Sequence, residues 1–148
     1  GCQLVATWDL AVAADAASFC TPGVNIGLFC STPMVATSRN VPRKKMMEML
    51  LLGEPVPAAE ALQLGLVNRV VPAAKLSDAT RAMAETVAQK SRLVVKIGKE
   101  AFYRQIEMPM AEAYDYASRV MTENMLARDA EEGIDAFLQK RKPKWEGR

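Results

Sequence analysis

Residues 50–72 read LLLGEPVPAAEALQLGLVNRVVP, and this stretch carries the clearest local signals of the fold. Residues 43–52, which lead into this stretch, predict a helix that stops at Gly53. A second short helix is expected over residues 58–64, ending at Gly65. Glycine is well suited to both stops because it adopts the left-handed conformation that commonly ends a helix.

The flanking segments indicate a compact α/β piece followed by helices. Residues 67–71, VNRVV, are rich in β-branched side chains and predict a strand. Upstream, residues 34–41 predict a short helix. Apolar residues spaced three and four apart predict a helical region over residues 73–140. Asp129 and Glu132 resemble a capping box, which would open the last helix. We expect two domains, residues 1–72 and residues 73–148.

The N-terminal segment has the composition of a backbone that passes close to a ligand. Small residues precede a strand-like run at residues 9–13, and Pro22-Gly23 predicts a turn in which a positive φ would favour the glycine. Three cysteines also lie in this segment, at Cys2, Cys20 and Cys30. Such residues more commonly serve as small buried apolar side chains. Cys20 and Cys30 are also candidates for polar groups near Gly23.

Composition excludes several classes of function. The chain has 148 residues, half of them hydrophobic, and a net charge of +2. No run approaches the roughly 20 apolar residues of a membrane span, and no basic helical stripe indicates nucleic-acid binding. Histidine is absent, so Ser-His-Asp and Cys-His mechanisms cannot be assembled from this chain. We expect no metal and no other cofactor. Because the first residue is Gly, we expect the chain to be the C-terminal part of a longer protein.

Four segments carry a resemblance to a known superfamily. They are GCQLVATWDLAVAAD (1–15), SFCTPGVNIGLF (18–29), MMEMLLLGEPVPAAEALQLGLVNRVVP (46–72) and ARDAEEGIDAFLQKRKPKW (127–145). In order and spacing they resemble the C-terminal half of the crotonase (enoyl-CoA hydratase/isomerase) superfamily, and within it a mitochondrial subgroup. The resemblance implies an α/β fold, the C-terminal part of a ββα spiral, followed by a helical trimerisation region.

The resemblance also implies an acyl-CoA ligand whose thioester oxygen lies between two backbone N–H groups. Such donors stabilise the negative charge that develops on an enolate. By this likeness one donor precedes Gly1 and the other lies in the N-terminal half, so the chain holds no complete oxyanion hole. The two glutamates that hydratases of the superfamily use fall on Gln3 and Gly23. Glutamine cannot exchange a proton at neutral pH, and glycine has no side chain.

The substitutions leave the activity open. The resemblance places substrate-binding residues at Gly1, Gln3, Gly23, Phe29 and Lys142, and we assign no catalytic residue. We expect an enoyl-CoA hydratase/isomerase-like protein of fatty-acid metabolism that binds acyl-CoA without ordinary glutamate-dependent hydration. The alternatives are a non-catalytic oligomeric interaction protein and an orthodox hydratase. Gln3 could also be only a polar residue at a helix start.

The resemblance further implies a partner and a compartment. We expect a homotrimer or a hexamer in the mitochondrion, with no nucleic acid and no membrane span. Basic residues gather in the tail, at Lys140, Arg141, Lys142, Lys144 and Arg148. They are either a solvated terminus or a contact to the phosphate groups of a ligand, in which lysines would act as point charges. The methionine-rich helix faces are expected to be core or helix-partner surface, some of it between subunits.

Overall fold

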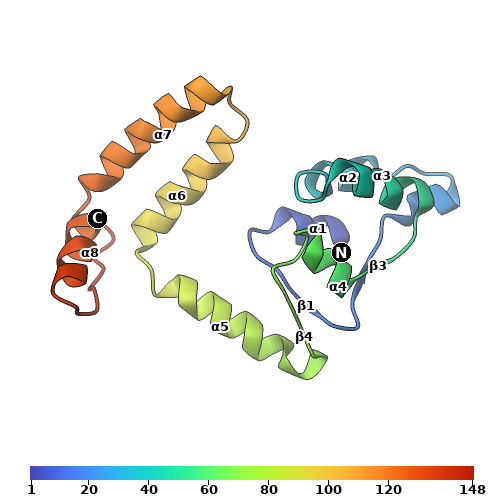
Figure 1. Cartoon of the computed structure of the whole chain (residues 1–148), viewed down its shortest axis with the longest axis horizontal. Helices are drawn as coiled ribbons and strands as arrows, with labels where there is room; N and C mark the ends of the chain where they lie inside the picture. The colour runs from blue at the N-terminus through green and yellow to red at the C-terminus, as the bar shows by residue number, and fades with distance from the viewer. The chain divides into compact units, whose positions relative to one another are not determined.

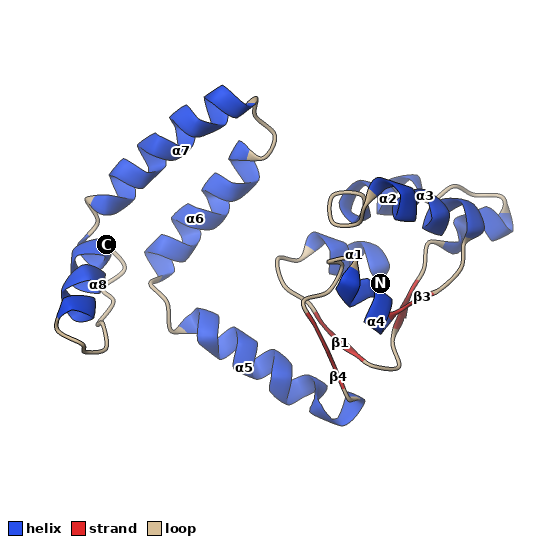
Figure 2. Ribbon diagram, in the orientation of Figure 1, coloured by secondary structure: helices blue, strands red, loops and turns tan.

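The computed structural model describes all 148 residues, which form two compact units, Gly1–Met83 and Ala84–Arg148 (Figure 1). Helices predominate, and the strands are few and short (Figure 2). The predicted domain boundary at residue 72 stays a prediction.

The first unit contains α1 (Cys2–Thr7), β1 (Val12–Ala14), β2 (Ser18–Phe19), the 3-10 turn η1 (Pro22–Ile26), α2 (Ser31–Thr37), α3 (Arg43–Leu52), β3 (Val56–Pro57), α4 (Ala58–Gln63), β4 (Arg69–Val71) and η2 (Ala73–Lys75). Helix α5 (Leu76–Ala88) begins in the first unit and ends in the second. The second unit continues with α6 (Arg92–Gln105), α7 (Met110–Met125) and α8 (Arg128–Leu138).

Two pairs of short strands join segments that are distant in sequence. Strand β1 lies parallel to β4, with Ala13 opposite Val70. Strand β2 lies antiparallel to β3, with Phe19 opposite Val56. These pairings hold the N-terminal segment against the part of the chain that carries the two glycine-ended helices.

The core of the first unit is built around α3. Met46, Met49 and Leu50 recur at steps of three and four and are only 3%, 2% and 2% exposed. This spacing places them on one face of the helix. The other members of the buried cluster are Ala6, Ala13, Phe19, Val41, Val56, Ala58, Ala61, Leu66 and Val67. The same cluster therefore supports both strand pairs and the start of the chain.

The glycine-ended helices agree with the sequence. Helix α3 has the predicted bounds, and its cap Gly53 has φ 64°. Helix α4 ends at Gln63, one residue earlier than predicted, and Gly65 has φ 80°. Helix stops of this kind are set locally by the torsion angles that only glycine adopts readily. These helix ends are the features of the fold that the sequence predicts best.

Three other element boundaries were predicted wrongly. The strand-like run expected at residues 9–13 is β1, which covers only Val12–Ala14. Helix α2 begins at Ser31 and ends at Thr37, whereas a helix over residues 34–41 was expected. Pro33 can occupy the first turn of a helix, so the helix starts before it. The strand expected from residue 67 begins at Arg69, and Asn68 before it bonds to Ala11, the residue that precedes β1. The backbone N–H of Asn68 donates to the carbonyl of Ala11 at 2.8 Å, and its side-chain oxygen accepts from the Ala11 N–H at 2.7 Å.

The predicted capping box at the last helix is also wrong. Helix α8 begins at Arg128 with Ala127 as its cap, so Asp129 lies inside the helix. Asp129 is 1% exposed and accepts hydrogen bonds from the Ser91 hydroxyl and from the backbone N–H groups of Glu146 (2.7 Å) and Gly147 (3.1 Å). These bonds hold the pKa of Asp129 below its ordinary value. Contacts to the distant tail replace the local cap.

The apolar faces of the second unit divide into covered and uncovered ones. Leu93, Ile97 and Ala101 on α6 are half-buried. On α7, Tyr114 and Met121 are 71% and 61% exposed. The expectation that part of the methionine-rich surface lies between subunits stays a prediction. No helix of the chain is long and apolar enough to cross a membrane.

Candidate functional site

The first two expected substrate-binding residues lie at the start of α1. Gly1 is the helix cap, and its carbonyl accepts a hydrogen bond from the Val5 N–H at 3.1 Å. Gln3 lies in the first turn and is exposed. Its side-chain amide makes no hydrogen bond within the chain, while its backbone carbonyl accepts from the Thr7 hydroxyl at 2.8 Å. The Gln3 amide is therefore free to bind a ligand or water.

Gly23 lies in a tightly folded loop. Its carbonyl accepts from the Leu28 N–H at 2.9 Å, and its own N–H donates to the Cys30 sulfur at 3.3 Å. The residue is part of η1 and does not have a positive φ, so the expected turn geometry was wrong. The left-handed residue of this loop is Gly27, with φ 77°.

Space is what requires glycine at position 23. A Cβ atom placed there would lie 2.8 Å from the Leu28 carbonyl oxygen and 2.9 Å from the Cys30 sulfur. Both distances are shorter than carbon atoms in proteins normally allow, and one of the obstructing atoms belongs to the backbone. A side chain at this position needs a rearranged loop.

The three thiols line the same part of the first unit. All are free and half-buried. Burial raises the pKa of Cys2, and the thiols of Cys20 and Cys30 raise it further because a second negative charge nearby is unfavourable. A hydrogen bond with Thr37 acts in the opposite direction. Cys2 adjoins Gln3 in the sequence, and the Cys30 sulfur accepts from the Gly23 N–H, so a thiol lies beside each position.

The remaining expected binding residues are on the surface. Phe29 is 46% exposed. Lys142 is exposed in the tail of the second unit, where it has no ion-pair partner. Two other basic residues of the tail are engaged, because Arg141 bonds to Glu132 at 2.6 Å and Arg148 to Glu146 at 2.7 Å. Their role in binding stays a prediction.

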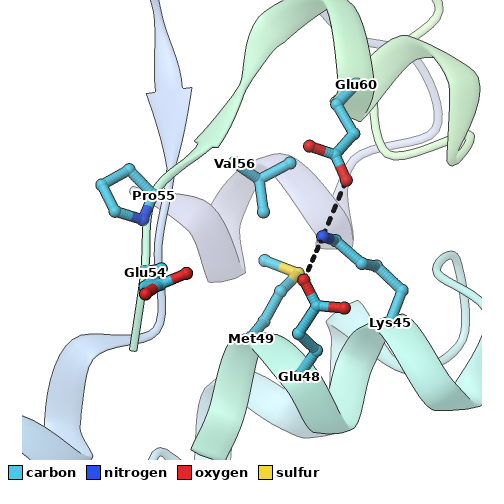
Figure 3. A pocket seen from close by; sticks show the side chains of 7 residues that line it. All are labelled: Lys45, Glu48, Met49, Glu54, Pro55, Val56 and Glu60. Carbon is cyan, nitrogen blue, oxygen red and sulfur yellow. Dashed lines mark hydrogen bonds and ion pairs between the residues drawn. The ribbon is translucent and has the colours of Figure 1, made fainter. Parts of the chain in front are cut away.

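A polar pocket on the surface of the first unit was not predicted from the sequence. Figure 3 shows Lys45 between the carboxylates of Glu48 and Glu60, with Nζ–O distances of 2.6 and 2.7 Å. These two hydrogen bonds raise the pKa of Lys45, so the ammonium stays protonated and cannot act as a base. The i, i+3 spacing of Lys45 and Glu48 was the available signal. The cation links α3 to α4, which is a structural role.

No group of three or more His, Cys, Asp or Glu side chains in the chain could hold a metal ion. Near Gln3 and Gly23 this chain presents an amide, backbone groups and thiols.

Comparison with known proteins identifies the family. The family described as enoyl-CoA hydratase/isomerase matches residues 1–148. The chain belongs to this family. It is 55% identical to the human protein "Enoyl-CoA hydratase domain-containing protein 3, mitochondrial" over 145 residues, which are 98% of the chain and 48% of the relative. It is 36% identical to "Probable enoyl-CoA hydratase echA8" of Mycobacterium leprae over 149 residues, or 98% of the chain and 57% of that protein.

Solved structures of this family show the same fold. An enoyl-CoA hydratase from Mycobacterium smegmatis matches with a TM-score of 0.96 and 53% identity, over 98% of this chain and 56% of that one. Human enoyl Coenzyme A hydratase domain-containing protein 3 matches with a TM-score of 0.94 and 55% identity, over 97% and 57%. The expected fold class, the α/β fold of the crotonase superfamily, is thus confirmed. The chain spans about half the length of the curated relatives it matches, 48% in the first case.

Proposed function

We propose that this enoyl-CoA hydratase/isomerase family member binds acyl-CoA thioesters in fatty-acid metabolism without ordinary glutamate-dependent hydration. Its substrate-binding residues in this chain would be Gly1, Gln3, Gly23, Phe29 and Lys142. The observation that carries the proposal is the packing at Gly23, where a Cβ would lie 2.8 Å from a backbone oxygen.

The chemistry follows from the side chains at the two positions. Hydration needs one group to take a proton from water and one to deliver a proton to carbon. The Gln3 amide can hold a water molecule or a carbonyl oxygen but does not titrate near neutral pH. At Gly23 the loop leaves no room for a carboxylate. Any remaining reaction would depend on stabilising an enolate, as in isomerisation or thioester handling.

Assembly and location are part of the same proposal. The exposed stripe on α7, which includes Tyr114 and Met121, supports association into a homotrimer or a hexamer, because large uncovered apolar patches commonly mark protein interfaces. The relatives named mitochondrial support a mitochondrial location.

Two measurements on the full-length protein test the proposal. Isothermal titration with butyryl-CoA, a saturated thioester, should show binding at micromolar concentrations. Hydration of crotonyl-CoA should be far below the rates of glutamate-bearing relatives. Hydration at ordinary rates would refute the loss of this activity.

A non-catalytic oligomeric interaction protein is the second candidate, favoured by the exposed apolar helix faces alone. This candidate predicts an intact oligomer with no heat of binding for any acyl-CoA. Saturable binding of butyryl-CoA would exclude it.

A further inference from the structure

A basic hollow lies within the second unit, between the junction of α5 and α6 and the C-terminal tail. We define it by Lys90, Arg92, Lys96 and Trp145, which line it. Its volume is about 740 Å³, within the range of roughly 300–1,000 Å³ that is typical of small-molecule sites. None of the five residues assigned above to acyl-CoA binding lines this hollow.

The hollow is positively charged because two of its three cations have no ion-pair partner. Neither Lys90 nor Arg92 has a carboxylate within ion-pair distance, and the carboxylate nearest Lys96 belongs to Glu100, at 3.9 Å. The acidic residue of the lining, Glu146, is already paired with Arg148 at 2.7 Å. Three cations that converge on one concave surface attract anions and raise their local concentration.

The aromatic wall of the hollow is held in a fixed position. The Trp145 indole N–H donates to the carbonyl of Gln89 at 2.8 Å, and the ring packs against Gly133, where a Cβ atom would lie 3.4 Å from it. The next two residues of the tail donate their backbone N–H groups to the buried carboxylate of Asp129. The indole is thus positioned before any ligand arrives, which lowers the entropic cost of binding.

We propose that the basic hollow binds a nucleoside phosphate, with the phosphate groups on Lys90, Arg92 and Lys96 and the base against Trp145. Guanidinium and ammonium groups are the usual partners of phosphate oxygens, and planar bases stack on aromatic side chains. The volume, the unpaired Lys90 and Arg92 and the fixed ring all match this class of ligand. The inference does not rest on the proposed acyl-CoA site.

Isothermal titration of the full-length protein with ADP tests the inference. We expect saturable binding that weakens with added salt, because the attraction is electrostatic. Arg92→Ala/Lys96→Ala should bind at least about tenfold more weakly, since it removes two charged partners of the phosphates. Lys75→Ala/Arg81→Ala is the matched control, because it removes the same charges outside the hollow and should bind ADP as the wild type does.

Pyrophosphate separates the two parts of the proposed contact. Weaker binding of pyrophosphate than of ADP supports a base on Trp145, whereas equal binding would overturn that contact. No saturable binding of either compound up to about 10 mM, or equal loss in both double variants, would overturn the inference. Butyryl-CoA titrated in parallel reports on the proposed function, because its binding with no ADP binding would refute the hollow alone.

Discussion

Replacing Gly23 with alanine tests the central structural argument with the smallest possible change. The added methyl group would lie 2.8 Å from the Leu28 carbonyl oxygen and 2.9 Å from the Cys30 sulfur. Because one of these atoms is backbone, the loop must move or the contact must be strained. Overpacking of this kind typically costs about 1–3 kcal/mol, and we expect Gly23→Ala to destabilise the protein by that amount.

Two further glycine-to-alanine changes serve as controls. They distinguish the steric cost of an added methyl group from the torsional cost of a positive φ. Gly27 has φ 77° and no atom within 4 Å of the position that an added methyl group would take, so Gly27→Ala should cost about 1–2 kcal/mol through torsional strain alone. Gly98 lies inside α6, also with nothing within 4 Å. Gly98→Ala should therefore stabilise the protein by about 0.5–1 kcal/mol.

Urea unfolding of the full-length variants measures these differences. The double variant Gly23→Ala/Cys30→Ala should be less destabilised than the sum of its single variants, because removing the thiol relieves one of the two close contacts. A Gly23→Ala protein within about 0.5 kcal/mol of the wild type would refute the argument that space requires glycine here.

Three other predictions concern the core, the tail and the thiols. Met49→Ala should lower the free energy of unfolding by about 2–5 kcal/mol in urea titrations, because this side chain is 2% exposed; a change below about 1 kcal/mol would contradict its place in the core. Glu132 has a pKa lowered to about 2, first by Arg141 and then by the Lys144 N–H. The stabilisation that the Glu132 carboxylate provides is present above its unfolded pKa of about 4.5 and is lost as pH falls toward 2. The melting-temperature difference between wild type and Glu132→Gln should therefore shrink over this range. A constant difference down to pH ~3 would contradict this expectation. Cys2 should be alkylated by iodoacetamide more slowly than N-acetylcysteine at neutral pH, as followed by mass spectrometry, because its raised pKa leaves less thiolate. Labelling of Cys2 at the rate of N-acetylcysteine would contradict the burial argument.

Local signals account for what the sequence could predict. Helix α3 has the predicted bounds because Pro42 and Gly53 flank it and both act on their own torsion angles. These bounds need no knowledge of distant segments. The buried face of α3 was not predicted, because the exposed Met47, Leu51 and Leu52 are as apolar as the buried residues beside them.

Contacts between distant segments explain what the sequence could not predict. Asp129 and Glu132 have the spacing of a capping box, but Asp129 bonds to Ser91 and to the tail, which lie 38 and 17 residues away. Gly23 was expected to serve a turn by its torsion, yet the obstruction comes from the folded-back Leu28 and Cys30. The partners of Asp129 are distant in sequence, whereas Leu28 and Cys30 are near in sequence and approach Gly23 only through the fold of an irregular loop.

The crowding at Gly23 also limits how such a site can change over generations. The glycine codons GGA and GGG become glutamate codons through a single nucleotide substitution. In this loop, however, the new side chain would meet the Leu28 carbonyl at 2.8 Å before it could serve any chemistry. Stability would fall at once, while an advantage would have to wait for a second change in the loop. The packing thus disfavours a glutamate at this position unless the loop changes with it.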